Sequence, residues 1–328
     1  MAIPPSTKLL GILAMNVMKS LIKPKAIGPG DVIGLVSPSG PVTHMDRFEG
    51  GIASLREVGF NVVLGKNALK KHYHMAGSDE ERSEDINEMF KDPNVKGIVT
   101  TTGGYSSSRI LDLIDYDLIK RNPKVFVGIS DITVLLNAIH EKTGLVTFHG
   151  PYLVYGICGM SDYVKRNLMK VVATPSEIGN LEQLTEWESL KGGNASGRLL
   201  GGNSSSVRNL IGTEYEPDWN GSILFLEAFM KEPHYLDREF THFRQCGIFN
   251  KINGLVVGKL NKCIENEFKD DPMDLREMIL EQCKGYNFPI IYGVDFGHAC
   301  ENLTLPVGIE VHMDTHTKKL NINQSATI

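Results

Sequence analysis

The segment Val125-Phe-Val-Gly-Ile-Ser-Asp131 decides how the first half of this chain folds. Its apolar run is typical of a buried strand, and a helical pattern from Asp131 to Lys142 follows without a linker. The same order of strand and helix recurs on both sides of the segment, from residue 31 to residue 148. Such alternation predicts a parallel sheet with helices on both faces. In sheets of this kind, we expect functional side chains at the carboxyl ends of the strands.

The expected elements extend over most of the chain. In the first half, we expect strands at 31–36, 60–64, 95–101, 125–129 and 145–148, and helices at 46–58, 78–91, 107–119 and 131–142. In the second half, we expect strands at 222–226, 252–257, 290–292 and 308–313, and helices at 237–246 and 274–282. The pattern predicts two α/β domains, at residues 23–170 and 198–328, joined by a polar crossing segment at 171–197.

Residues 1–22 are expected to be a leader or an extra helix. Their apolar run, Leu9 to Met18, is far shorter than the roughly 20 residues that span a bilayer. A signal peptide is disfavoured because no small-residue cleavage site follows the run, and an upstream start codon is a further alternative. We therefore expect no association with a membrane.

The charge balance argues against a nucleic-acid partner. The 328 residues include 34 basic and 39 acidic side chains, whereas proteins that bind along phosphates need clustered surplus lysine and arginine. The five cysteines are widely spaced and form no Cys-x-x-Cys motif, which predicts reduced thiols in a cytoplasmic protein. The ten histidines show no spacing typical of metal ligands, so we expect no metal site.

Ser130 lies where a strand gives way to a helix. A serine on such a tight turn has an exposed hydroxyl beside the N–H groups of the helix start, as nucleophilic serines do. The pattern departs from Gly-x-Ser-x-Gly because Ile132 replaces the second glycine, which disfavours a conventional α/β-hydrolase. The alternative is that Ser130 or Asp131 only caps the helix.

Three further segments place chemically useful groups at strand ends or in tight loops. Gly103 and Gly104 follow the strand at 95–101, where glycine allows backbone N–H groups to approach an anion, although an ordinary turn is the alternative. Glu227 ends an apolar run, where a carboxylate must be paired or functional. His298 follows a glycine in a loop. Together with Ser130, these residues include a nucleophile, an orienting carboxylate and a base, although spacing alone does not show that they meet.

In these segments, the chain resembles the serine L,D-carboxypeptidase family, which also contains the microcin self-immunity peptidases. The resemblance extends from about Ile22 to Leu320. It rests on the ordered blocks Gly28-Pro-Gly-Asp31 to Ser37-Pro-Ser39, Gly103-Gly-Tyr105 with Arg109, Gly128-Ile-Ser-Asp131, Gly201-Gly-Asn203, Leu224-Phe-Leu-Glu227, and Phe296-Gly-His298 with Leu303-Thr-Leu-Pro-Val-Gly308. The resemblance implies a flavodoxin-like parallel sheet in the N-terminal domain and a smaller, β-rich, swivelling-barrel-like C-terminal domain. It also implies a cytoplasmic homodimer without metal or cofactor.

The resemblance further implies a role for each of eight residues. The catalytic triad would be Ser130, Glu227 and His298, the oxyanion hole would use the backbone N–H groups of Gly104 and Asp131, and the candidates for binding substrate would be Arg109, Asn203 and Lys231. The implied reaction is hydrolysis, through an acyl-enzyme, of the bond between the L-centre of a diamino acid and the terminal D-alanine of a cell-wall tetrapeptide.

The substrate stays open between two branches of the family. Lys231, four residues after Glu227, resembles the microcin-immunity branch, whose members cleave the amide of a peptidyl- or aminoacyl-nucleotide. The segment 232–238 and the short crossing segment instead resemble the branch that recycles cell-wall peptides. A two-domain α/β binding protein without catalysis is the alternative from another functional class.

Overall fold

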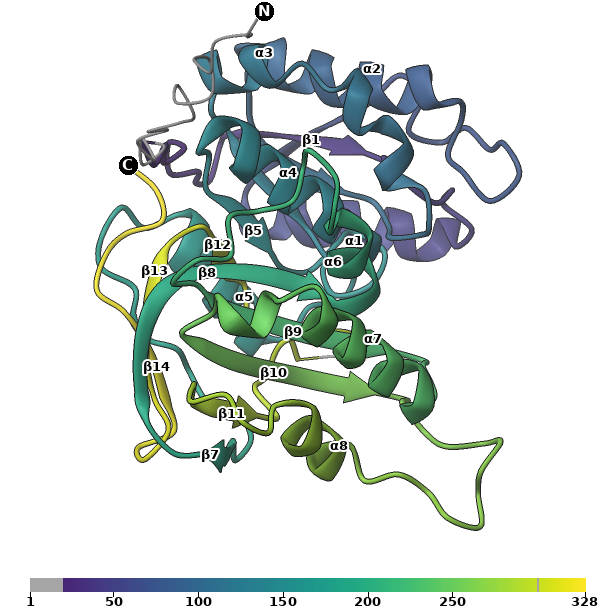
Figure 1. Ribbon diagram of the computed structural model, residues 1–328. Helices are drawn as coiled ribbons and strands as arrows, with labels where there is room; N and C mark the ends of the chain where they lie inside the picture. The colour runs from purple at the N-terminus through teal and green to yellow at the C-terminus, as the bar shows by residue number, and fades with distance from the viewer. Residues whose placement is uncertain (1–19, 300) are drawn as a thin grey trace, which may run out of the picture.

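The protein consists of two β-sheets with helices packed around them (Figure 1). The computed structural model describes residues 20–299 and 301–328. Most of the predicted leader at 1–22 therefore lies outside the described residues, as does Cys300. The C-terminus returns to the start of the described chain, where the Ala26 N–H donates to the Ile328 carbonyl oxygen at 2.8 Å. The expected α/β fold in two parts is confirmed.

The first sheet is parallel except for one edge strand. Its order is β12-β5-β4-β3-β1-β2, and β12 runs antiparallel to β5. Without β12, this is the flavodoxin-like order that the resemblance implied. Apolar residues dominate β3 and β4, which are buried because helices cover both faces of a parallel sheet. The strands are β1 (Val32–Val36), β2 (Asn61–Leu64), β3 (Val95–Thr100), β4 (Val125–Gly128), β5 (Thr147–His149) and β12 (Leu305–Val307).

The helices of this part begin and end at residues suited to helix termini. Ser78 and Glu81 form a capping box at the start of α2, and Gly59 ends α1 in the left-handed conformation. The connection from β1 to β2 runs toward one edge of the sheet, and the later connections run toward the other edge. Because such connections are right-handed, α1 lies on the opposite face of the sheet from α2 and α3 (Figure 1). The helical segments are α1 (Met45–Val58), α2 (Asp79–Lys91), η1 (Ser107–Leu113), α3 (Tyr116–Arg121), η2 (Ser130–Ile132), α4 (Thr133–Thr143) and α5 (Asp162–Val172).

The second sheet has the order β6-β14-β13-β8-β9-β10-β11-β7. Its centre is parallel, from β8 to β11, and its remaining strands pair antiparallel. The strands are β6 (Gly179–Asn180), β7 (Glu188–Lys191), β8 (Asn194–Asn203), β9 (Ile223–Phe229), β10 (Gly254–Asn261), β11 (Ile290–Tyr292), β13 (Glu310–Asp314) and β14 (Lys319–Ile322). The helical segments are α6 (Ser204–Leu210), α7 (Pro233–Gln245), η3 (Ile248–Asn250) and α8 (Leu275–Gln282).

The strand expected at 308–313 is present as β13, and an additional strand, β12, comes just before it. The chain leaves the first sheet after β12, turns at Gly308, and enters the second sheet as β13. Gly308 has a φ of +92°, a conformation that glycine adopts without strain. The expected helix at 107–119 is divided into η1 and α3. None of the described helices is long and apolar enough to cross a membrane.

Candidate active site

Ser130 is held in a strained backbone conformation directly after β4. Its φ is +68°, which is uncommon for a residue with a side chain and costs about 1–3 kcal/mol. The residues on either side of Ser130 are buried, whereas Ser130 itself is partly exposed. The N-cap residues of η2 and α4 are Ile129 and Ile132, so neither Ser130 nor Asp131 occupies the N-cap position of the helical segments that follow β4. The conformation is the strained strand-to-helix turn on which nucleophilic serines are presented.

The loop after β3 passes directly over Ser130. A Cβ atom added to Gly103 would lie 2.8 Å from the Ser130 Cβ and 3.0 Å from its Oγ, so only glycine fits there. The Gly103 carbonyl oxygen accepts a hydrogen bond from the Gly40 N–H at 2.9 Å, which ties the loop to the turn after β1. Gly104 follows with a φ of +151°. Its backbone N–H stays a predicted oxyanion donor.

The Asp131 carboxylate joins three loops at the carboxyl ends of β1, β3 and β4. It accepts hydrogen bonds from the Ser39 Oγ at 2.5 Å and from the Ser107 N–H at 2.8 Å, and the Ser107 Oγ donates to the Asp131 carbonyl oxygen at 2.6 Å. The side chain of Asp131 is therefore occupied in fixing the turn that carries Ser130. Its backbone N–H, like that of Gly104, stays a predicted oxyanion donor.

Glu227 and His298 form a buried hydrogen-bonded pair. Glu227 lies within β9 and is fully buried, and its Oε2 is 2.7 Å from the His298 Nδ1. Its other oxygen, Oε1, accepts a hydrogen bond from the Asn203 Nδ2 at 2.9 Å. Burial alone would raise the pKa of Glu227, but the His298 imidazole and its hydrogen bond outweigh burial and hold that pKa below its usual value. The carboxylate therefore stays ionised beside the imidazole.

The imidazole of His298 is also held on one face and through its backbone. Phe229, two residues after Glu227 on the same strand, stacks on the ring with centroids 4.7 Å apart and planes within 7° of parallel. The Asn261 Nδ2 donates a hydrogen bond to the His298 carbonyl oxygen. With Nδ1 bound to Glu227, the ring nitrogen available for proton transfer is Nε2.

Ser206 connects the serine to the buried pair. Its Oγ is 3.3 Å from the Ser130 carbonyl oxygen and 3.3 Å from the Asn203 Oδ1, and Asn203 in turn contacts Glu227. The Asn203 N–H also donates to the Thr133 Oγ1 at 3.0 Å, next to the start of α4. These contacts bring the carboxyl end of β4 in the first sheet against the end of β8 in the second.

The remaining two predicted substrate contacts are engaged in ion pairs. Arg109 makes a bidentate pair with Asp79, at 3.0 Å from Nε and 2.8 Å from Nη2. Lys231 contacts the Ser205 Oγ and the carboxylate of the buried Glu239. Substrate binding by Arg109, Asn203 and Lys231 stays a prediction. The described residues with the geometry of a metal site are Glu232, His234 and Glu265, which are not among the predicted site residues.

Sequence reasoning missed two aromatic residues of this region. One is Phe229, for which the only signal was its spacing of two residues from Glu227 on a strand. The other is His149 at the end of β5, which is fully buried and packs edge-on against Phe225 and Phe296. Neither ring nitrogen of His149 has a hydrogen-bond partner, and burial lowers its pKa to about 4.

His149 is expected to make the free energy of unfolding depend on pH. In the folded protein, the ring stays neutral down to about pH 4, whereas the unfolded chain takes up a proton near pH 6.5. The stability due to neutral His149 is therefore present above about pH 6.5 and lost as the pH falls toward 4. Urea denaturation at pH 7 and at pH 4.5 measures this effect. Between these two pH values, we expect the free energy of unfolding to fall by about 2–3 kcal/mol less in His149→Leu than in the unsubstituted protein. An equal difference in both proteins would contradict this assignment.

Models of one protein family match both halves of the chain. The model described as the LD-carboxypeptidase N-terminal domain matches residues 33–150. The model described as the LD-carboxypeptidase C-terminal domain matches residues 196–313.

Similar proteins cover nearly the whole chain. A probable murein peptide carboxypeptidase of Bacillus subtilis is 33% identical over 94% of this chain and 95% of its own length. The microcin self-immunity protein MccF of Escherichia coli is 30% identical over 93% of this chain and 96% of its own. A solved muramoyltetrapeptide carboxypeptidase from Oxalobacter formigenes is 28% identical, with a TM-score of 0.78 over 90% of this chain and 99% of that chain.

Two solved structures of MccF bear on its active site. One is an active site mutant in which a serine, an asparagine and a lysine are replaced by alanine, and it matches with a TM-score of 0.87 and 28% identity over 94% of this chain and 100% of that chain. The other is a complex with aspartyl sulfamoyl adenosine, with a TM-score of 0.86 and 28% identity over the same shares of the two chains. With a family model on each half and relatives above 30% identity over nearly its full length, this chain belongs to the LD-carboxypeptidase family.

Proposed function

We propose that this protein is a serine carboxypeptidase that removes the terminal D-alanine of murein tetrapeptides, with Ser130 as nucleophile, His298 as base and Glu227 as the orienting carboxylate. The observation that carries the proposal is the buried hydrogen bond between Glu227 and His298, which Asn203 and Ser206 link to the backbone of a serine with positive φ. The names of relatives as murein peptide and muramoyltetrapeptide carboxypeptidases support the choice of substrate.

In the proposed reaction, the Ser130 Oγ attacks the carbonyl carbon that precedes D-alanine, and the His298 Nε2 takes the hydroxyl proton. The oxyanion that forms is stabilised by the backbone N–H groups of Gly104 and Asp131. His298 then gives its proton to the leaving amine of D-alanine, which leaves an acyl-enzyme. Water, deprotonated by the same imidazole, hydrolyses the ester and restores the serine. These steps use only groups of the chain and water, so no cofactor is proposed.

The test of this function is a pair of tetrapeptides that differ only in their last residue. Mass spectrometry should detect release of D-alanine from the tetrapeptide that ends in D-alanine, and no release from the one that ends in L-alanine. In ¹⁸O-labelled water, the tripeptide product should gain one labelled oxygen atom. Equal cleavage of both peptides would contradict the L,D-specificity, and cleavage of neither would contradict the proposed substrate.

A serine-directed fluorophosphonate probe distinguishes an enzyme from a binding protein. Labelling requires a hydroxyl that a base activates, so we expect the probe to label the unsubstituted protein and to leave His298→Ala unlabelled. Absence of labelling in the unsubstituted protein would favour the non-catalytic alternative, and full labelling of His298→Ala would exclude His298 as the base.

Lys231 favours a second candidate function, the cleavage of an aminoacyl-nucleotide amide. The serine, asparagine and lysine of the MccF active site mutant are the residue types of Ser130, Asn203 and Lys231, and MccF has been solved with aspartyl sulfamoyl adenosine. The ammonium group of Lys231 lies beside Ser205, two residues from Asn203, where it could exchange Glu239 for the carboxylate of an acidic substrate.

Lys231→Ala is expected to lower kcat/KM for aspartyl sulfamoyl adenosine by about 10- to 100-fold, because a charge-assisted hydrogen bond contributes about 1.5–3 kcal/mol. Cleavage of the murein tetrapeptide should change by less than about threefold, and this activity serves as the control for folding of the same preparation. Lys231→Arg, which keeps the charge, should restore much of the lost activity. Equal losses on both substrates would contradict a role of Lys231 in choosing the substrate.

We further propose that the enzyme works in the cytoplasm as a homodimer. The resemblance to the family supports both statements, and the four cysteines within the described residues are free thiols, as the cytoplasm favours. Light scattering coupled to size-exclusion chromatography tests the dimer, for which a mass of twice 36.3 kDa is expected. A mass of 36.3 kDa at micromolar concentration would contradict it.

A further inference from the structure

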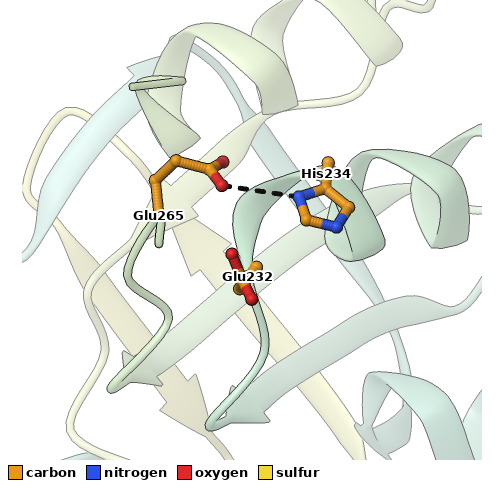
Figure 2. A group of neighbouring side chains, drawn as sticks. All are labelled: Glu232, His234 and Glu265. Carbon is orange, nitrogen blue, oxygen red and sulfur yellow. Dashed lines mark ion pairs between the residues drawn. The ribbon is translucent and has the colours of Figure 1, made fainter. Parts of the chain in front are cut away.

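Three side chains converge outside the candidate active site, and Figure 2 shows them pointing toward one another. Glu232 precedes α7, His234 lies in the first turn of that helix, and Glu265 comes from the loop at residues 262–274 between β10 and α8. One ligand atom from each residue lies within 4.8 Å of the other two. Two carboxylate oxygens and an imidazole nitrogen are a donor set that divalent transition metals accept.

The charges of this cluster are not balanced by lysine or arginine. Among residues 20–299 and 301–328, the only cationic partner found for the Glu265 carboxylate is His234, and no ion pair is found for Glu232. The N–H groups of Asn266 and Glu267 donate to the Glu232 Oε2, each at 3.0 Å, and they fix its position. The Glu265 side chain is only 4% exposed. Two neighbouring carboxylates, one of them buried, favour a bound cation.

The position of His234 is the second observation that points to a ligand. Its Nδ1 is buried and has no hydrogen-bond partner, although it faces the Glu265 Oε1 at 3.5 Å. That separation is too long for a good hydrogen bond. It is close to the distance of about 3.3–3.4 Å between two ligand atoms of a tetrahedral ion with bonds of 2.0–2.1 Å.

We propose that Glu232, His234 and Glu265 bind a divalent transition metal ion, with Zn²⁺ as the preferred ion. The ion would join the loop at 262–274 to Glu232, which directly follows Lys231, and to the first turn of α7. A surface pocket of about 350 Å³, lined in part by Pro233, Cys263 and Glu265, adjoins the Glu265 side of the proposed site. This site is independent of the proposed function, because it shares no residue with the candidate triad.

A titration of metal-free, full-length protein with Zn²⁺ by isothermal calorimetry tests the proposal. We expect one ion per chain, and an affinity at least about tenfold lower in Glu265→Gln and in His234→Gln. Glu267→Gln is the matched control, because the Glu267 carboxylate is 65% exposed and lies 4.0 Å from the His234 Nε2. The Zn²⁺ affinity of this variant should stay within about threefold of that of the unsubstituted protein.

A second set of variants separates this site from a competing one on the same helix. His242 lies in the last turn of α7 and Cys246 directly follows the helix. The Cys246 sulfur is 3.6 Å from the His242 Nε2, so this pair could also bind Zn²⁺. Cys246→Ser should leave the proposed site intact, and the Co²⁺-loaded protein should show no thiolate charge-transfer band. Loss of Zn²⁺ binding in Cys246→Ser with retention in Glu265→Gln would overturn the proposal. So would the absence of stoichiometric binding to the unsubstituted protein.

Discussion

Replacing Ser130 with alanine is expected to lower kcat/KM for D-alanine release by about 10⁴- to 10⁶-fold. Without the hydroxyl, no acyl-enzyme forms, and the residual rate comes only from substrate binding and the oxyanion donors. The fold should be kept, because alanine meets the same backbone strain at a φ of +68° as serine does. Steady-state kinetics with the murein tetrapeptide, together with the midpoint of urea unfolding, measures both effects.

Two comparisons make this prediction specific. Ser108, an exposed serine in η1, is the matched control, and Ser108→Ala should keep full activity. The double variant Ser130→Ala, His298→Ala should be no slower than Ser130→Ala alone, because residues that act as one unit give non-additive losses. Retention of more than about a tenth of the activity by Ser130→Ala would exclude Ser130 as the nucleophile.

The first half of the fold followed from local sequence because its elements are local. The strand that ends at Gly128 and the helix that follows it are set by apolar periodicity, and Ser78 and Gly59 mark helix boundaries through their own backbone chemistry. The strand expected at 308–313 is present as β13, but β12 was missed because periodicity does not show that a short apolar segment pairs with a different sheet. Only the turn at Gly308 separates β12 from β13, and the two strands pair with partners far apart in the chain.

No strand was expected where long β8 lies, for a related reason. Its sequence, Asn194 to Asn203, is rich in glycine and asparagine, which are typical of loops rather than strands. These glycines are required because neighbouring elements approach closely, and a Cβ added to Gly202 would lie 2.5 Å from the Thr133 Oγ1. The packing of α4 against β8 joins residues far apart in the sequence, so local patterns do not show it. The same packing brings Asn203 next to the candidate site.

The candidate site itself could be predicted as a set of residues but not as a geometry. Glu227 and His298 are 71 residues apart, and their hydrogen bond depends on how β9 and the loop after β11 are placed. Phe229 and Asn261, which also hold His298, had no distinct signal because neither residue type by itself indicates a contact with a histidine. The cluster of Glu232, His234 and Glu265 was missed because its third member comes from a distant loop.

Replacing Glu227 with glutamine is the other substitution with a very large expected effect. We expect kcat/KM for D-alanine release to fall by about 10³- to 10⁴-fold, since changing the carboxylate of a serine–histidine–carboxylate triad to an amide costs about 10⁴ in kcat. Glutamine has nearly the same size and shape, so no cavity forms. The loss should therefore appear in the tetrapeptide assay without a large change in the midpoint of urea unfolding at pH 7.

The physical reason lies in how Asn203 orients the side chain at position 227. The Asn203 Nδ2 donates to one oxygen of Glu227 while the other oxygen accepts from His298. In Glu227→Gln, the amide oxygen would turn toward Asn203, so the amide N–H₂ would face the His298 Nδ1 and place the imidazole proton on Nε2. That tautomer cannot take the proton of Ser130.

The same reasoning predicts how a second substitution changes the loss. In Glu227→Gln, Asn203→Ala, the amide is free to turn its oxygen toward His298, which restores the tautomer with an unprotonated Nε2. We therefore expect the double variant to be about tenfold more active than Glu227→Gln, although Asn203→Ala alone should be less active than the unsubstituted enzyme. If Asn203→Ala lowers the activity equally in both backgrounds, the orientation of residue 227 is not set by Asn203, and the proposed cause of the loss is wrong.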